Sequence, residues 1–133
     1  MFSAPQVNIY SADVARSIEF YRGIGFDETF RTPRDGAPIH VELVLDGFKV
    51  GIAAVGSAVA DHGLDLDLAR PGRGMEIVLW TDDTDAAFAG LVAAGAREVS
   101  APHDWLESLR VAWVADPDDN PIELVQRRDG RQR

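Results

Sequence analysis

The sequence predicts an α+β fold built from two tandem βαβββ modules, whose curved mixed sheets surround a cavity. Two observations lead to this prediction. Short segments with alternating apolar residues flank one segment of helical periodicity in each half of the chain. The same order of segments then recurs in the second half, which indicates an internal duplication. We expect a single domain over residues 1–133, with modules at 1–54 and 75–126, a linker at 55–74 and a frayed tail at 127–133.

The first module is expected to hold four strands and one helix. Val7 and Ile9 alternate with polar residues, which is typical of a half-buried strand. Asp13 precedes apolar residues with helical spacing, so it is placed to cap a helix, and Gly25 ends that helix. The Asp-Gly pair at 46–47 predicts a two-residue hairpin turn. The expected strands are 6–10, 26–31, 39–45 and 48–54.

The linker is expected to be irregular, and the second module to repeat the first. Residues 55–74 show no sustained period and are rich in Gly, Pro and Asp, so at most a short helical turn is expected there. Asp83 is placed to cap a helix that runs to residue 94, with Phe88, Leu91 and Val92 toward the core and Gly95 as its stop. The expected strands are 75–80, 97–101, 109–115 and 121–126.

The two halves align at an offset of 70 residues over most of their length. The matched positions are Asp13 with Asp83, Ile18 with Phe88, Gly25 with Gly95, and Val41, Leu43 and Asp46 with Val111, Trp113 and Asp116. Gln6 corresponds to Glu76. After the last hairpin the offset becomes 72, so Gly51 corresponds to Glu123. Strand alternation places these four residues opposite their apolar neighbours, on the face that we expect to be concave.

Two segments carry a resemblance to a known family: residues 13–26 (DVARSIEFYRGIGF) and residues 116–124 (DPDDNPIEL). They resemble the vicinal oxygen chelate superfamily, which includes glyoxalase I, extradiol dioxygenases, fosfomycin-resistance enzymes and bleomycin-resistance proteins. The resemblance extends over nearly the whole chain and implies the glyoxalase/bleomycin-resistance fold. In character the chain is most similar to the metal-independent, bleomycin-resistance-like members.

The resemblance also implies where a metal would bind. In metal-dependent members four equivalent positions supply His, Glu or Gln ligands to a divalent ion, and here they read Gln6, Gly51, Glu76 and Glu123. Gly51 has no donor and none of the four is His, so an extradiol dioxygenase's two-His, one-carboxylate set is absent. No metal or other cofactor is therefore expected. The alternative is a divalent-metal-dependent lyase or isomerase of the glyoxalase I type, with Gln6, Glu76 and Glu123 as ligands and Glu123 as the catalytic residue.

The expected cavity has acidic and aromatic walls. His40 shares a strand face with Glu42, and Trp105 is expected in a loop before the seventh strand. Carboxylates among strand cores need water, a ligand or a partner, and Arg110 is a candidate structural partner as well as a ligand contact. Trp113 matches an apolar residue of the first half and is predicted to lie in the core. The candidate ligand-binding residues are Gln6, Asn8, Tyr10, His40, Glu42, Glu76, Trp80, Trp105, Arg110 and Glu123.

The composition limits the classes of partner that we expect for this chain. The formal charge is −9, from 22 acidic and 13 basic residues, and basic residues gather only in the tail, so nucleic acid is not expected. There is no cysteine, no apolar run long enough for a membrane and no secretory pattern at the start, which favours a cytoplasmic protein. An acidic protein favours cationic ligands, although its charge also serves solubility. We therefore expect metal-independent sequestration of a cationic or planar small molecule, and the resemblance further implies a homodimer.

Overall fold

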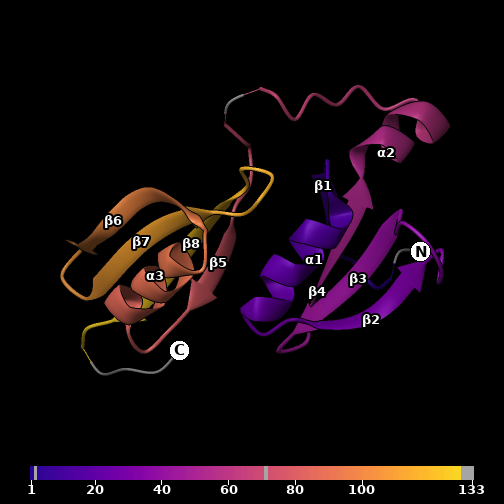
Figure 1. Cartoon of the computed structure of the whole chain (residues 1–133). Coiled ribbons are helices and arrows are strands. Elements are labelled where there is room, and N and C mark those ends of the chain that lie inside the picture. Colours follow the sequence, from indigo (N-terminus) through magenta and orange to yellow (C-terminus); the bar gives the residue numbers. More distant parts are fainter. Residues whose placement is uncertain (2, 71, 130–133) are drawn as a thin grey trace. The chain divides into compact units, whose positions relative to one another are not determined.

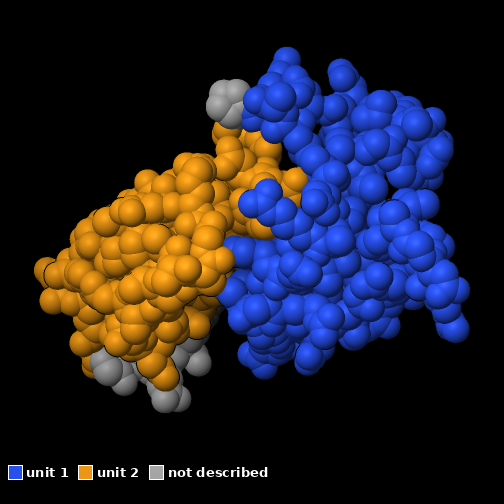
Figure 2. Space-filling view, in the orientation of Figure 1, with its two compact units in different colours: residues 1–71 blue, residues 72–133 orange. Residues whose placement is uncertain are grey.

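The chain divides into two compact units, residues 1–71 and 72–133, which Figure 2 colours separately. The computed structural model describes residues 1, 3–70 and 72–129. Each unit contains one four-stranded mixed sheet with a helix packed on one face (Figure 1). The predicted α+β class and its two βαβββ modules are confirmed.

Unit 1 is built on the sheet order β1-β4-β3-β2, in which β1 is parallel to β4 and the other pairs are antiparallel. The Asp13 carboxylate accepts from the backbone N–H of Arg16 and so caps α1, as expected. The helix buries Tyr21 completely, and the Tyr21 ring meets Phe26 edge to face at 5.6 Å. The elements are β1 Val7–Ser11, α1 Val14–Gly23, β2 Asp27–Thr32, β3 His40–Leu45, β4 Phe48–Ala54 and α2 Val55–His62.

Unit 2 repeats this arrangement with the sheet order β5-β8-β7-β6. Asp83 caps α3 through a bond from the backbone N–H of Ala86. Thr84 is fully buried: its N–H donates to the Gln126 side chain and its hydroxyl to the carbonyl of Arg110, which ties α3 to β7 and β8. The elements are β5 Ile77–Trp80, α3 Thr84–Ala93, β6 Arg97–Trp105, β7 Leu109–Ala115 and β8 Pro121–Arg127.

The linker contains more structure than expected, because α2 makes a helix of eight residues directly after β4. Gly63 ends it in the left-handed region with φ of 67°, a conformation that suits glycine. The N–H of Gly63 donates to the carbonyl of Val59, as in the αL motif, and the N–H of Leu64 donates to the carbonyl of Ala58. This turn brings Leu64 back beside the helix. A short apolar segment without side-chain caps left no strong helix signal in the sequence.

Two strands are also longer than predicted. β6 continues to Trp105, so His103 and Trp105 lie in a strand rather than in a loop. β8 includes Arg127, and the N–H of Arg128 donates to the carbonyl of Ser108 at 2.7 Å, so the start of the expected frayed tail is held by hydrogen bonds. The rest of that tail, residues 130–133, lies outside the described residues.

The sheet register corrects one part of the predicted repeat. Gly51 on β4 pairs with Glu42 on β3, whereas Glu123 on β8 pairs with Trp113 on β7. Trp113 is therefore the counterpart of Glu42, at an offset of 71, and not of Leu43. The prediction that Trp113 lies in the core was wrong for this reason.

The extra residue enters in β6. Both edge strands carry an irregularity at the same place, after Glu28 in β2 and after Glu98 in β6. β6 alone has a second irregularity. Ser100 pairs with Trp113 and His103 pairs with Val111, so this stretch of β6 is one residue longer than the stretch of β7 that it faces. Because bulges leave little trace in a hydrophobic pattern, alignment of the two halves could not locate this one.

Candidate functional site

Each sheet has one face free of its helix, and we call it the open face. In unit 1 the apolar residues Val41, Leu43, Val50 and Ile52 are fully buried on the helix-bearing side. Alternation then places the intervening residues on the open face. The central row of the open face is Asn8, Gly51 and Glu42 in unit 1, and Val78, Glu123 and Trp113 in unit 2.

In unit 1 two side chains close over the glycine of this row. A Cβ placed on Gly51 would lie 2.1 Å from Oδ1 of Asn8 and 2.8 Å from Cε1 of His40. Gln6 extends the group, because its Nε2 donates to Oδ1 of Asn8 at 2.9 Å. The position without a donor is therefore filled by neighbouring side chains, and glycine is what lets them approach.

Glu42, on the same open face, has cationic and aromatic neighbours. Its carboxylate lies 3.5 Å from Nζ of Lys49 and 4.0 Å from Nε2 of His40. The His40 ring in turn lies 6.3 Å from the ring of Phe30. Such a half-exposed ion pair adds little stability, so its effect is to hold the carboxylate and the imidazole in place.

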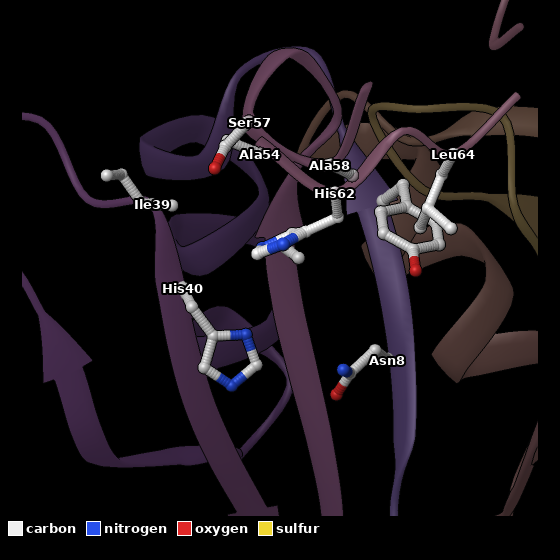
Figure 3. Close-up of a pocket in the computed structure, with 10 residues that line it drawn as sticks. Asn8, Ile39, His40, Ala54, Ser57, Ala58, His62 and Leu64 are labelled. Atoms are coloured by element: carbon white, nitrogen blue, oxygen red, sulfur yellow. The ribbon is translucent and has the colours of Figure 1, made fainter. Parts of the chain in front are cut away.

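A cavity of about 190 Å³ opens at the end of this face, beneath α2 (Figure 3). The strand residues Asn8, Tyr10 and His40 supply part of its wall, and His62 reaches in from the last position of α2. The remaining lining residues are mostly small or apolar: Ile39, Ala53, Ala54, Ser57, Ala58 and Leu64. Asn8, Tyr10 and His40 were predicted as site residues, whereas His62 was placed in the linker without a role.

In unit 2 the open face carries a hydrogen-bonded group of two carboxylates and an indole. The indole Nε1 of Trp113 donates to Oε2 of Glu76 at 2.7 Å. Glu76 also shares a side-chain hydrogen bond with Glu123. Burial, followed by the hydrogen bond and the charge of Glu76, raises the pKa of Glu123 above its ordinary value. Glu76 and Glu123 thus lie together, as the repeat predicted, and sequence reasoning missed the Trp113 donor.

Further aromatic side chains extend this open face. Trp80 is 37% exposed and carries the guanidinium of Arg127 at 5.1 Å from its ring centroid. His103 stacks on Trp113 with ring centroids 6.1 Å apart. Trp105, at the end of β6, is 52% exposed. Arg127 and His103 were not among the predicted site residues, because the first was assigned to the tail and the second to a loop.

Arg110 lies away from this group. Its guanidinium pairs with Asp85 on α3 and with Asp104, whose Oδ1 lies 3.0 Å from Nη1. The hydrogen bond from Arg110 lowers the pKa of Asp85 below its usual range. Its register partner is Gln126, which bonds to α3, so Arg110 is on the helix-bearing face. It partners aspartates there, whereas the sequence offered it as a partner of Glu76 and Glu123.

Candidate metal ligands lie on the open face of each unit. Across residues 1, 3–70 and 72–129, no group of three or more His, Asp or Glu side chains is placed to hold an ion. In unit 2 Glu76 and Glu123 bond to each other, and Glu76 also accepts from Trp113. Two carboxylates are fewer than the three protein ligands of a typical catalytic zinc site.

Comparison with known proteins places the chain in a family. The profile of the Glyoxalase/Bleomycin resistance protein/Dioxygenase superfamily matches residues 3–124, and the chain belongs to that superfamily. No curated protein matches the sequence. Among the helices of the described residues, none is long and apolar enough to cross a bilayer.

Solved structures show the same fold at low sequence identity. The chain is similar to the hypothetical protein SA1046 from S. aureus, with 18% identity, a TM-score of 0.78, and 95% of this chain and 94% of that chain covered. TioX from Micromonospora sp. ML1 is 22% identical, with a TM-score of 0.68 and coverage of 93% and 99%. A glyoxalase-related enzyme from Fulvimarina pelagi is 22% identical, with a TM-score of 0.76 and coverage of 95% and 88%.

Proposed function

We propose that this member of the superfamily binds and sequesters a planar, cationic small molecule without a metal ion. The observation that carries the proposal is the open face of unit 2, where the hydrogen-bonded pair Glu76 and Glu123 lies among aromatic side chains. Paired carboxylates attract a cation, and indole faces favour flat or cationic groups. Trp80 already holds a guanidinium on its ring, which supports cation binding at that position.

The carboxylates also suit reversible binding. A cation beside Glu123 would favour its ionised form and so lower the pKa that burial and Glu76 raise. Binding would thus be coupled to proton release, which requires neither a metal nor a covalent step. The metal-dependent lyase or isomerase finds no supporting observation in the donor set described above.

The test uses the purified chain with proflavine, a planar aromatic cation, followed by calorimetry and thermal unfolding. We expect stoichiometric binding that raises Tm and persists after exhaustive treatment with a chelator. Elemental analysis of the complex should find no stoichiometric metal. Binding that disappears with the chelator, or conversion of a glyoxalase I substrate that returns with added metal, would support the enzymatic alternative instead.

Three variants locate the binding face. Trp80→Ala and Glu123→Gln should each weaken proflavine binding about tenfold, a change of about 1.4 kcal/mol. Arg127→Ala should strengthen it, because the variant removes a competing cation from the Trp80 ring. Phe48→Ala and Glu98→Gln are matched controls, since both residues are exposed, Phe48 belongs to unit 1, and Glu98 pairs with Val114, which is buried on the helix-bearing side of unit 2. Equal weakening by the controls would contradict the assignment.

A further inference from the structure

The cavity of unit 1 has the opposite chemistry to the open face of unit 2. None of its lining residues is acidic, while Asn8, Tyr10, His40 and His62 all offer polar hydrogens or ring nitrogens. Figure 3 shows the His40 side chain at the left, Asn8 at the right, and His62 between and above them. A ligand there meets N–H and O–H donors and no carboxylate among the lining residues, which favours a ligand that supplies acceptors.

The nearby carboxylates are already engaged. Glu42 lies beside Lys49, and Asp61 accepts a hydrogen bond from Ser57 at 2.6 Å. By contrast, the side chains of Tyr10 and His62 make no hydrogen bond with any of the residues that the structure describes. Two polar groups that face the cavity therefore remain available to a ligand.

The rest of the wall is apolar, and part of it is exposed. Ile39 and Leu64 are 44% and 40% exposed although both line the cavity. Leu64 is held there by the turn at Gly63 that ends α2. Apolar side chains at the mouth of a small cavity favour a ligand that covers them, such as the face of a ring.

The volume limits the size of that ring. A cavity of about 150 Å³ is large enough for benzene, and the one in unit 1 measures about 190 Å³. One six-membered ring with a single polar substituent fills this space, whereas a fused tricyclic compound exceeds it. The size, the apolar wall and the donors together define one ligand class.

We propose that unit 1 contains a separate binding site for a single-ring aromatic carboxylate. The ring lies against Ile39, Ala58 and Leu64, and the carboxylate accepts hydrogen bonds from His62, Tyr10 and Asn8. All the residues named for this site belong to unit 1, and none of them is used by the proposed cation site of unit 2. Either can therefore fail its test while the other passes.

The test compares three probes of equal size on the full chain: benzoate, neutral benzamide and cationic benzylammonium. Calorimetry should show benzoate bound at least tenfold more tightly than benzylammonium, with benzamide between them. Acetate, which has the carboxylate but no ring, should not compete. In an amide NMR titration, benzoate shifts should concentrate at β1, the start of β3 and α2.

Variants test the donors. His62→Ala should weaken benzoate binding about tenfold, and His62→Gln, which keeps a side-chain N–H, should retain part of the affinity. Tyr10→Phe is a second variant that removes one donor, the Tyr10 hydroxyl, with little change of shape. Val59→Ala is the control on the same helix, because Val59 is exposed and does not line the cavity, and it should leave benzoate affinity unchanged. The proposal is overturned if benzoate shows no saturable binding at millimolar concentration, if benzylammonium binds equally well, or if Val59→Ala weakens binding as much as His62→Ala.

Discussion

At the residue scale, Glu123 combines partial burial with a second carboxylate beside it. The raised pKa means that the folded protein holds this proton more tightly than the unfolded chain does. The contribution of Glu123 to the free energy of unfolding is therefore fully present at low pH, and it is lost as the pH rises through the pKa of Glu123 in the folded protein. Glutamine keeps the shape and the hydrogen-bonding capacity without this dependence.

We accordingly predict that Glu123→Gln becomes more stable than the natural chain as the pH rises from about 4 to about 7. Urea unfolding at several pH values gives the free energy of unfolding of both proteins. Glu98→Gln, at an exposed position of β6, is the control variant. A difference between Glu123→Gln and the natural chain that shrinks with rising pH would contradict the explanation.

The same residue predicts how cation binding depends on pH. Because a cation favours ionised Glu123, proflavine affinity should rise as the pH increases through the raised pKa and then level off. Calorimetry in buffers of different ionisation enthalpy should detect the proton released on binding. In the Glu123→Gln variant both the release and the pH dependence should be reduced. If the variant releases as many protons on binding as the natural chain does, the proton comes from a group other than Glu123.

Gly51 offers a second test at this scale. Alanine there removes unfolded-state entropy, which stabilises by about 0.4–1 kcal/mol, but it pushes against the movable ends of Asn8 and His40. The two effects oppose each other, so Gly51→Ala should change the free energy of unfolding by less than about 1 kcal/mol. In an Asn8→Ala background the same change should be more favourable, which a double-mutant cycle by urea unfolding measures. Strict additivity of the two changes would show that Asn8 does not oppose the new methyl group.

At the element scale, the turn between β7 and β8 contains the first part of residues 116–124, the second segment that resembles the family. Asp116 is 4% exposed, and its carboxylate accepts from the backbone N–H groups of Asp118 and Asn120 and from the Asn120 side chain. Asp119 occupies the left-handed region that this turn requires, with φ of 70°. Residues 116–120 of the segment therefore shape a turn, and the role of the Asp116 carboxylate is structural.

Replacing that carboxylate should destabilise unit 2. Asp116→Ala removes the carboxylate that accepts from the half-buried backbone N–H groups of Asp118 and Asn120, and we expect a loss of about 2–4 kcal/mol in the free energy of unfolding. Asp116→Asn keeps one acceptor oxygen and should lose less. Urea unfolding measures both variants, and Asp46→Ala, at the shorter turn of unit 1, is the comparison. A smaller loss for Asp116→Ala than for Asp46→Ala would contradict this account.

The elements also show what the sequence could reveal. Period-two and helical patterns with their caps predicted seven of the eight strands closely, together with α1 and α3, because these segments bury one face. Helix α2 was missed because it lacks a side-chain cap, and the second irregularity of β6 because edge strands tolerate an extra residue. Those two elements supply His62 and His103. The repeat predicted Glu76 and Glu123 on one face of the sheet, where the structure has them as neighbours, whereas His62, His103 and Trp113 were not predicted as binding residues.

At the scale of the whole molecule, the net charge of −9 should act on the two proposed ligands in opposite directions. Added salt screens this charge, so proflavine affinity should fall as sodium chloride increases from about 0.01 M to about 1 M. Benzoate affinity should fall less or rise, because the same screening relieves its repulsion. Calorimetry across this range tests both. Parallel losses for the two ligands would show that the overall charge does not decide their difference.

We also propose that the chain forms a homodimer, as the resemblance implied. Several large apolar side chains are well exposed in unit 2, with Met75 at 64% and Leu106 at 65%. Sedimentation equilibrium should give a mass of twice the 14.5 kDa chain. A measured mass that remains that of one chain at high protein concentration would exclude the dimer.

The second irregularity of β6 makes this edge strand a point where the protein can diversify. β6 ends the sheet order of unit 2, so a residue gained or lost there does not disturb the pairing of β5, β7 and β8. It does change which side chain comes to rest on the Trp113 ring, a place now held by His103. Small length changes in one peripheral strand can therefore alter ligand preference while the buried core and its stability stay the same. Descendants of one duplicated ancestor could in this way acquire different ligands without rebuilding the fold.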